Sequence, residues 1–495
     1  MTLKFNNMKF SNMKFSNKFL YAALMAAISF FAATPAEAKV ELPPILSNHM
    51  VLQQKSVVKL WGKGNGTIDV SVSWNSKTYQ TQCDKDGKWI LSLETPSATY
   101  TPQSITISDK DNSVVLKDVL LGEVWLCGGQ SNMEMPLDGF WACPVEGSAE
   151  AIATAGQWKD KIRRVKIPKT GHVEVQETVE GKWEVPSTET AGGISAVGWF
   201  FANMLNNVLD VPVGLVECNW GGSAVESWLP KEIVDTYPVE TLANPKVLNK
   251  EPGGWWHHTS SYVMYNAMLH PVHNYAVKGF IWYQGETNAG LSQYYAERLA
   301  TMVKEWRDLW GMGELPFYEV ELAPWKYGGD GTSGARQREA QRKAVDLIPN
   351  SGIVTTNDLV YPYEYDQIHP CKKKEVGYRL AYQALNKTYN KKGVVCDGPV
   401  YKSMEVKGNE IVISFHGSQE GFSPWHGIVG FEVAGEDRVF HPAEARIQDV
   451  HYIVVKSDAV ANPVAVRYCF RDFQIGNLVG RRNMPVAPFR SDNWK

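Results

Sequence analysis

The chain has 495 residues, of which 44% are hydrophobic and 21% are charged, and its formal net charge at pH 7 is −3. This length predicts about two to four domains, and the near-neutral charge excludes a dedicated nucleic-acid-binding protein, because phosphate binding requires a clear basic excess. The ordinary apolar and charged fractions also exclude wholesale disorder. The 18 tryptophans are an excess that fits either sugar-stacking surfaces or core filling.

Residues 1–38 are predicted to be a signal peptide for export. Four lysines precede an apolar run over residues 19–33, and Ala36 and Ala38 then complete an A-x-A cleavage site. The run is shorter than the roughly 20 apolar residues that a membrane span needs, and no later segment reaches that length. We therefore expect a secreted or periplasmic protein without a membrane span, cleaved near Ala38.

Three regions follow the predicted signal peptide. In residues 39–115, short runs of alternating polarity separated by glycine turns predict an N-terminal β-sandwich domain. In residues 116–394, apolar runs alternate with helical patterns, which predicts an α/β domain with a parallel sheet covered on both faces. A β-like insertion lies near residues 162–185, and residues 395–495 again read as a β-rich domain.

The individual elements are predicted from the period of the apolar residues. A helix over residues 295–310 is expected to end at Gly311, and another apolar helical face covers residues 197–209. Strands are expected at residues 57–61, 68–72, 89–93, 124–127, 213–218, 279–283, 317–322, 352–356, 411–415, 430–433 and 464–470.

The cysteines and histidines give no metal signature. The cysteine number is odd and the spacing irregular, which excludes a disulfide scaffold but leaves one or two disulfides open. The pair His257-His258 lacks an H-E-x-x-H or other ligand spacing, so we predict no metal and no cofactor. The seven cysteines are Cys83, Cys127, Cys143, Cys218, Cys371, Cys396 and Cys469.

Small and polar residues follow four of the strands predicted for the α/β domain. In an open parallel sheet, ligands bind beyond the carboxyl ends of the strands, so these residues are expected to share one edge. Their common placement is the strongest functional signal in the chain. The four segments are residues 128–133, 219–223, 284–288 and 365–370.

Ser131, His369 and Asp366 form a candidate catalytic triad. Two glycines turn the chain sharply before Ser131, although a serine at that point also fits a helix N-cap. The G-x-S-x-G motif of many hydrolases is absent because Met133 occupies the second glycine position. His369 is the predicted base, and Asp366, three residues earlier, is expected to hold its imidazole. Asp-x-x-His alone also fits a surface pair, but beside Ser131 it favours a triad.

An oxyanion needs preorganised hydrogen-bond donors. The candidates are the backbone N–H of Ser131, that of Gly222 or its neighbour Gly221, and a side-chain amide. Glu286 fits either a second general acid or a buried acceptor. The amide candidates are Gln284 and Asn288. Substrate binding is assigned to Trp220, Gln130 and Glu286. The remaining tryptophans of this region, Trp255, Trp256 and Trp282, fit either a sugar site or the core.

Three motifs resemble those of the SGNH-type carbohydrate esterases, above all the sialate O-acetylesterases. They are residues 129–133 (Gly-Gln-Ser-Asn-Met), residues 282–288 (Trp-Tyr-Gln-Gly-Glu-Thr-Asn) and residues 366–370 (Asp-Gln-Ile-His-Pro). The resemblance implies a three-layer α/β/α sheet domain with Ser131 as nucleophile, His369 as base and Asp366 as its orienting carboxylate. Thr287 stands where a serine is common, and the family's Gly-x-Asn-Asp form is missing, which leaves Gln284 and Asn288 both open as oxyanion donors.

Together these features predict a serine esterase that removes O-acetyl groups from carbohydrates, with sialate as the leading substrate, through an acetyl-enzyme. The alternatives are an O-acetyl esterase acting on plant cell-wall xylan or xyloglucan, and a glycan-binding protein without catalytic activity. A peptidase using the same triad ranks last because no specificity-pocket feature is apparent. The predicted partner is an O-acetylated glycan, and the sequence selects no oligomeric state.

Overall fold

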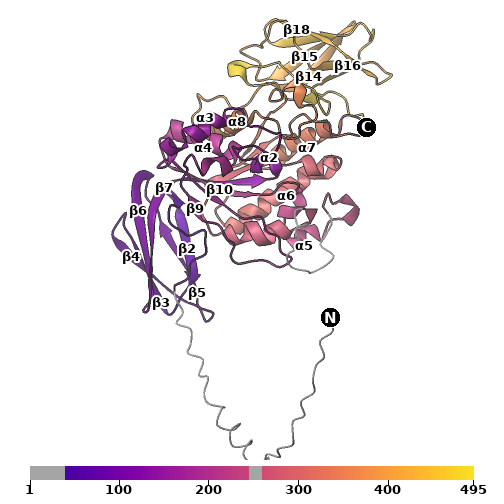
Figure 1. Cartoon of the computed structure of the whole chain (residues 1–495). Coiled ribbons are helices and arrows are strands. Elements are labelled where there is room, and N and C mark those ends of the chain that lie inside the picture. The colour runs from indigo at the N-terminus through magenta and orange to yellow at the C-terminus, as the bar shows by residue number, and fades with distance from the viewer. Residues whose placement is uncertain (1–39, 245–258, 495) are drawn as a thin grey trace, which may run out of the picture.

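The computed structural model describes residues 40–244 and 259–494. The predicted signal peptide, residues 1–38, lies outside this part of the chain. An N-terminal β-domain, a central α/β domain and a C-terminal β-domain follow one another along the molecule (Figure 1). Within the described residues, no helix combines the length and the apolar character that crossing a bilayer requires.

The N-terminal domain is built from strands that are antiparallel apart from the β1–β7 pair, and most of them alternate in burial, as predicted. Strands β2 and β5 form one small sheet, while β3 lies between β4 and β6, and β6 pairs with the first part of β7. The alternation follows from the two-residue period of a strand with one face on the core. The strands are β1 (Val51–Gln53), β2 (Val57–Lys63), β3 (Thr67–Val72), β4 (Lys77–Gln82), β5 (Lys88–Glu94), β6 (Thr99–Ser108) and β7 (Ser113–Gly129).

Strand β7 belongs to two domains at once. Its first residues pair with β6 of the N-terminal domain, and from Glu123 onward it pairs with β10 and β11 of the central sheet. The strand therefore runs through the boundary predicted at residue 115. A continuous main chain of 17 residues joins the two domains rigidly.

The central sheet has the order β13-β12-β11-β7-β10-β8-β9 and is parallel apart from the β8–β9 pair. Strand β7 lies in the middle, with β10 and β8 on one side and β11, β12 and β13 on the other. The carboxyl end of β7 is thus the point where the chain changes direction across the sheet, which is where ligands bind in such folds. The remaining strands are β8 (Ile162–Lys166), β9 (Trp183–Glu184), β10 (Val213–Asn219), β11 (Gly279–Tyr283), β12 (Phe317–Val320) and β13 (Ser351–Val354).

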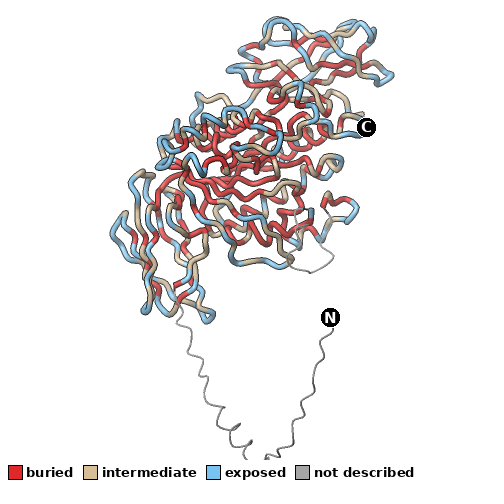
Figure 2. The backbone as a smooth tube through the Cα atoms, viewed as in Figure 1, coloured by how far each residue is buried: buried red, intermediate tan, exposed pale blue. Residues whose placement is uncertain are grey.

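Helices cover both faces of this sheet, so that its strands are buried (Figure 2). Along β7, Val124 packs into one apolar core with α6, and the next residue, Trp125, packs into the other with α4 and α8. This alternation is the two-residue period of a strand. The longer helices are α4 (Ala196–Leu209), α6 (Ser292–Trp310), α7 (Ser333–Leu347) and α8 (Lys373–Gln383), and the shorter ones are α2 (Ser131–Glu134), α3 (Ser148–Ala153) and α5 (Lys231–Val234).

The helix ends carry the expected caps. The Ser195 hydroxyl accepts a hydrogen bond from the Gly198 N–H at the start of α4. Gly311 adopts a left-handed conformation and ends α6, as predicted. Every strand and helix predicted for the central domain is present, and the bounds agree within a few residues except for β7, which begins at Ser113 rather than at residue 124.

The C-terminal domain holds two four-stranded antiparallel sheets around its own core. It is tied to the central domain by α7, where the Gly334 N–H donates to Asp472 Oδ1 at 2.7 Å. All seven cysteines lie within the described residues and are free thiols. The strands are β14 (Val400–Lys407), β15 (Glu410–His416), β16 (Phe431–Ala434), β17 (Phe440–Pro442), β18 (Glu444–Gln448), β19 (Tyr452–Lys456), β20 (Ala465–Tyr468) and β21 (Phe489–Arg490).

Candidate active site

The polar segments after β7, β10 and β11 start at the same level of the sheet. Gly129 at the end of β7 lies beside Asn219 of β10 on one side and beside Tyr283 of β11 on the other. The loops that follow these strands therefore meet at the centre of the carboxyl edge, as the sequence predicted.

Ser131 is the first residue of α2, directly after a turn that only glycine permits. Gly129 has φ +135°, and a Cβ there would lie 2.2 Å from the carbonyl oxygen of Tyr283. This close approach lets β7 pass into α2 without a loop, so that half-buried Ser131 projects from the sheet edge. Among the described residues, no group forms a hydrogen bond with its hydroxyl.

The turn formed by Gly221 and Gly222 packs against Ser131. A Cβ on Gly221 would lie 3.2 Å from Ser131 Cβ. The Gly221 N–H donates to Glu134 Oε2 at 2.7 Å, and this carboxylate also forms an ion pair with Lys169. The Gly222 N–H, in contrast, has no partner within residues 40–244 and 259–494. Of the two N–H groups of this turn, that of Gly221 is therefore engaged and that of Gly222 is not. Glu134 is a contact that was not predicted from the sequence.

His369 stands half-buried beside this edge. The Phe140 ring meets its imidazole edge-on at 5.0 Å, and Nδ1 lies 4.0 Å from Cys143 Sγ. Its Nε2 is buried and finds no partner in the described part of the chain. Burial, and secondarily the charge of Lys373, lowers the pKa of His369 to about 4. The imidazole is consequently neutral at pH 7, which is the form that can accept a proton.

Asp366 differs from its expected position. Its exposed carboxylate forms an ion pair with Lys326 rather than a hydrogen bond with His369. The Lys326 ammonium also lies over the Tyr365 ring, 5.7 Å from its centroid. The reason for the difference is that a cation from a segment 40 residues away competes for the carboxylate, which spacing along the chain does not reveal.

Asn132 links the turn of Ser131 to the segment of His369. Its Nδ2 donates to Glu286 Oε1 at 2.5 Å and to the Ile368 carbonyl at 3.1 Å, and its Oδ1 accepts from Lys373 Nζ at 2.7 Å. Burial lowers the pKa of Lys373 to about 8 and raises that of Glu286. Glu286 is thus a buried acceptor in this structure, and the hydrogen bonds hold the candidate nucleophile and base in register.

Asn132 and Lys373 were not singled out from the sequence. Asn132 adjoins Ser131 in the motif of residues 129–133, so its position in the sequence could have identified it as a site residue. Lys373 is one of three consecutive lysines at the start of α8, and only its complete burial distinguishes it.

The side-chain amides proposed for the oxyanion are already engaged. Gln284 Nε2 donates to Gln130 Oε1, the Ser223 carbonyl and Asn288 Oδ1 at 2.8–3.1 Å. Asn288 Nδ2 donates to Glu226 Oε2 at 3.0 Å, and Glu226 is paired with Arg298. Gln130 is buried and also accepts from the Gly285 N–H. These contacts favour a scaffolding role for all three amide side chains.

The tryptophans near the site divide between core and rim. Trp282 is fully buried and packs edge-on against Trp228 and Trp306. Trp220 is half-buried beside the Gly221 turn and packs against the core. Trp255 and Trp256, like His257-His258, lie outside the described residues.

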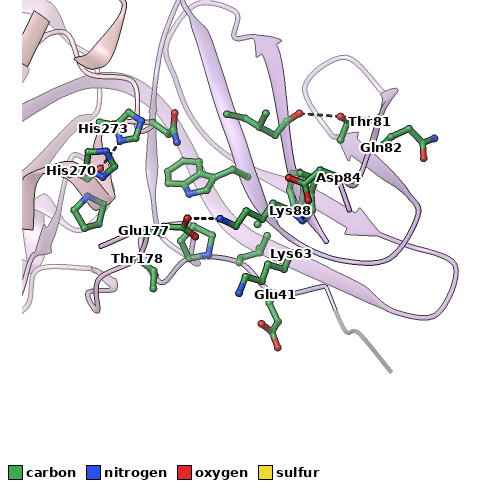
Figure 3. Close-up of a pocket in the computed structure, with 18 residues that line it drawn as sticks. Glu41, Lys63, Thr81, Gln82, Asp84, Lys88, Glu177, Thr178, His270 and His273 are labelled. Atoms are coloured by element: carbon green, nitrogen blue, oxygen red, sulfur yellow. Dashed lines mark hydrogen bonds and ion pairs between the residues drawn. The ribbon is translucent and has the colours of Figure 1, made fainter. Parts of the chain in front are cut away.

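A cavity of about 610 Å³ lies away from this edge, between the N-terminal β-domain and the central domain (Figure 3). Trp61 and Trp89 line it, and an ion pair between Lys88 and Glu177 spans it. None of the predicted catalytic residues contributes to its lining. Among the residues that the structure describes, no cluster of His, Cys, Asp or Glu is arranged to hold a metal ion.

Residues 121–386, more than half of the chain, match the family of carbohydrate esterases described as sialic acid-specific acetylesterases. The chain belongs to this family. The structure of a carbohydrate acetylesterase from Xanthomonas citri superposes with a TM-score of 0.81 at 35% identity, covering 92% of this chain and 100% of that one. Two mammalian relatives are also similar, and both are sialate O-acetylesterases. The mouse protein is 26% identical over 428 residues (76% of this chain, 78% of the relative), and the human protein is 26% identical over 402 residues (73% of each).

Family membership confirms the predicted enzyme class, a carboxylic ester hydrolase acting on carbohydrates. It also confirms the predicted fold, because the structural match covers nearly the whole described chain and includes the β-rich domains that flank the central sheet.

Proposed function

We propose that this esterase removes O-acetyl groups from sugars through an acetyl-enzyme, with O-acetylated sialate as its leading substrate. The mouse and human relatives that carry this activity in their names support the substrate. One observation supports the mechanism above all: Asn132, the neighbour of Ser131, donates a hydrogen bond to the Ile368 carbonyl just before His369. The Gly221–Gly222 turn also packs against Ser131 through Gly221.

In the first half-reaction, Ser131 Oγ attacks the acetyl carbonyl carbon while His369 Nε2 takes the hydroxyl proton. The negative charge that forms on the carbonyl oxygen is stabilised by the backbone N–H groups of Ser131 and Gly222. The bond to the sugar oxygen then breaks, His369 returns the proton to that oxygen, and the acetyl group remains on Ser131.

In the second half-reaction, water gives its proton to His369 and attacks the acetyl-serine. Collapse of the second tetrahedral intermediate releases acetate and restores the Ser131 hydroxyl with the proton held by His369. The neutral state of His369 at pH 7 suits it to both steps.

The other predicted residues receive supporting roles in this proposal. Asp366 orients the His369 imidazole once its ion pair with Lys326 has opened, which is compatible with the loose geometry typical of unliganded sites. Gln130, Gln284, Asn288 and Glu286 hold the turns in place, and Trp220 contributes to the wall beside the sugar.

A second substrate class is a neutral O-acetylated sugar of plant cell-wall xylan or xyloglucan. Two lysines that contact residues of the site favour it, because Lys169 is already paired with Glu134 and Lys373 already donates to Asn132 Oδ1. A sialate carboxylate needs a cation of its own, whereas a neutral sugar does not.

We further propose that the enzyme is exported, on the strength of the signal peptide predicted for residues 1–38. A secreted or periplasmic enzyme would meet acetylated glycans at the cell surface.

Acetate release from O-acetylated sialic acids, xylo-oligosaccharides and xyloglucan tests the function. We expect turnover of at least one class, and we expect Ser131→Ala to lower kcat by about 10³-fold or more. Ser97→Ala, at an exposed position of the N-terminal domain, is the matched control and should retain full activity. Full activity of the Ser131 variant would exclude the acetyl-enzyme, and absence of turnover on every glycan would exclude the proposed function.

A further inference from the structure

Trp141 is the most exposed large apolar side chain in the described part of the molecule. Its exposed fraction is 95%, whereas Trp125, Trp199 and Trp282 are fully buried in the core. A fully hydrated indole forgoes the free energy that its burial would contribute to folding. The indole therefore contributes little to the core and is free to contact a ligand.

The backbone around Trp141 is rigid. Phe140 and Cys143 exchange backbone hydrogen bonds of 3.0 and 2.9 Å, which closes a tight hairpin with Trp141 at its tip. Gly139 has φ +77°, and a Cβ there would lie 2.3 Å from the Cys143 carbonyl oxygen. Gln367 Nε2 donates to the Ala142 carbonyl at 2.9 Å. The indole is thus presented to solvent from a fixed platform, and little backbone entropy is lost when a ligand binds it.

The hairpin is anchored on the catalytic edge. The Phe140 ring packs edge-on against His369, and Cys143 Sγ donates to Gln367 Oε1 at 3.0 Å. Trp141 follows Phe140 directly, so it stands at the rim of the site, one residue from a side chain that contacts the proposed base.

Exposed tyrosines extend this rim on the segment that leads to His369. Tyr363 is 78% exposed and stacks on Tyr361 with ring centroids 5.2 Å apart, and Tyr365 is 50% exposed. The Tyr361 hydroxyl donates to Glu146 Oε2, which ties this segment to the chain just beyond the Trp141 hairpin. Aromatic faces on two linked segments offer a surface to which the C–H face of a pyranose ring can bind.

We propose that Trp141 forms a sugar-binding subsite for the unit linked to the acetylated sugar, so that the enzyme acts on acetyl groups within a glycan chain in preference to a free monosaccharide. This inference rests on the proposed esterase function, and it holds for both candidate substrate classes because the apolar face of a pyranose is common to them. A monosaccharide bound for attack by Ser131 leaves the Trp141 surface empty, whereas the neighbouring sugar of a chain covers it.

The test compares Trp141→Ala with Trp425→Ala, which removes another exposed tryptophan (62%) from the C-terminal domain. Both are assayed on two matched pairs: O-acetylated xylo-oligosaccharide against O-acetylated xylose, and 9-O-acetylated sialyl-lactose against free 9-O-acetylated sialic acid. The readout is the ratio of kcat/KM for the chain to kcat/KM for the monosaccharide. We expect Trp141→Ala to lower this ratio roughly three- to tenfold, mainly through KM, on the pair that the enzyme turns over faster. Trp141→Phe should keep most of the ratio, and Trp425→Ala should leave it unchanged.

The outcomes separate the subsite from the esterase function. Acetate release with an equal ratio in wild type and Trp141→Ala overturns the subsite and leaves the function standing. An equal loss on chain and monosaccharide also overturns it, because the tryptophan then acts only through the position of His369. Absence of acetate release from all four sugars, with p-nitrophenyl acetate still hydrolysed, overturns the proposed function and the subsite with it.

Discussion

The pKa of His369 is determined by the surroundings of the imidazole as well as by the residue type. A histidine in water titrates near its ordinary pKa of about 6.5. Burial of the imidazole, and secondarily the nearby charge of Lys373, lowers the pKa of His369 to about 4. The carboxylate that would raise it, Asp366, is held by Lys326 in this structure.

The acid limb of the pH profile follows from this pKa. The proposed mechanism needs the neutral imidazole, so protonation of His369 should abolish activity. The value of kcat/KM should therefore fall as the pH drops through about 4 rather than through about 6.5. The measurement is kcat/KM for p-nitrophenyl acetate from pH 3.5 to 8, with circular dichroism at each pH to establish that the protein remains folded. Because kcat/KM reports the free enzyme, a limb near 6.5 would contradict the buried, carboxylate-free imidazole described above.

The junction of β7 and α2 shows how an element can position a reactive group. Only a residue without a Cβ can pass beside the Tyr283 carbonyl, and this passage brings Ser131 directly to the sheet edge. Asn132 then ties α2 to the loop before α8 and to Glu286. The candidate site is therefore held by short, rigid connections, which is what preorganised catalysis requires.

Gly129→Ala should disrupt this junction. Its Cβ would meet the Tyr283 carbonyl oxygen at 2.2 Å, in addition to the strain of a φ of +135°, so we expect a loss of unfolding free energy above about 3 kcal/mol together with a large fall in kcat. Gly290→Ala is the matched control, because Gly290 also has a positive φ but a Cβ there would touch nothing within 4 Å. It should cost only about 1–2 kcal/mol. Chemical denaturation of both variants measures the difference, and equal losses would show that the contact with Tyr283 is unimportant.

The three regions predicted from the sequence do not correspond to three separate apolar cores. A single apolar core runs from the N-terminal β-domain into the central domain, and β7 passes through both. The C-terminal domain, in contrast, has a core of its own. The N-terminal domain therefore contributes to the apolar core that stabilises the central domain.

We expect this shared core to appear in calorimetry. Leu60→Ala, in the N-terminal part of the core, should lower the temperature of the transition in which the central domain unfolds, with a loss of about 2–5 kcal/mol. Ile453→Ala, equally buried in the C-terminal core, is the matched control and should affect a separate transition. A new low-temperature transition in the Leu60 variant, with the main one unchanged, would show that the N-terminal domain unfolds independently.

Local patterns were sufficient to predict the fold class and the location of the candidate site. The two-residue and 3.6-residue periods identify strands and helices, and parallel strands place their carboxyl ends together, so Ser131, Gly222 and His369 could be assigned to one edge without coordinates. These inferences need only neighbours along the chain and the geometry of a parallel sheet.

The partners of individual side chains were decided by the tertiary structure alone. Asp366 pairs with Lys326, and the Gln284 amide donates its hydrogen bonds to buried acceptors. Of three consecutive lysines, only Lys373 is completely buried. The tryptophan excess divides in the same way, with Trp282 in the core and Trp141 in solvent. The physical reason is that hydrogen bonds, ion pairs and burial depend on distances of a few ångströms between segments far apart in the chain. Sequence periodicity determines which face of an element a residue occupies, but packing determines what that face meets.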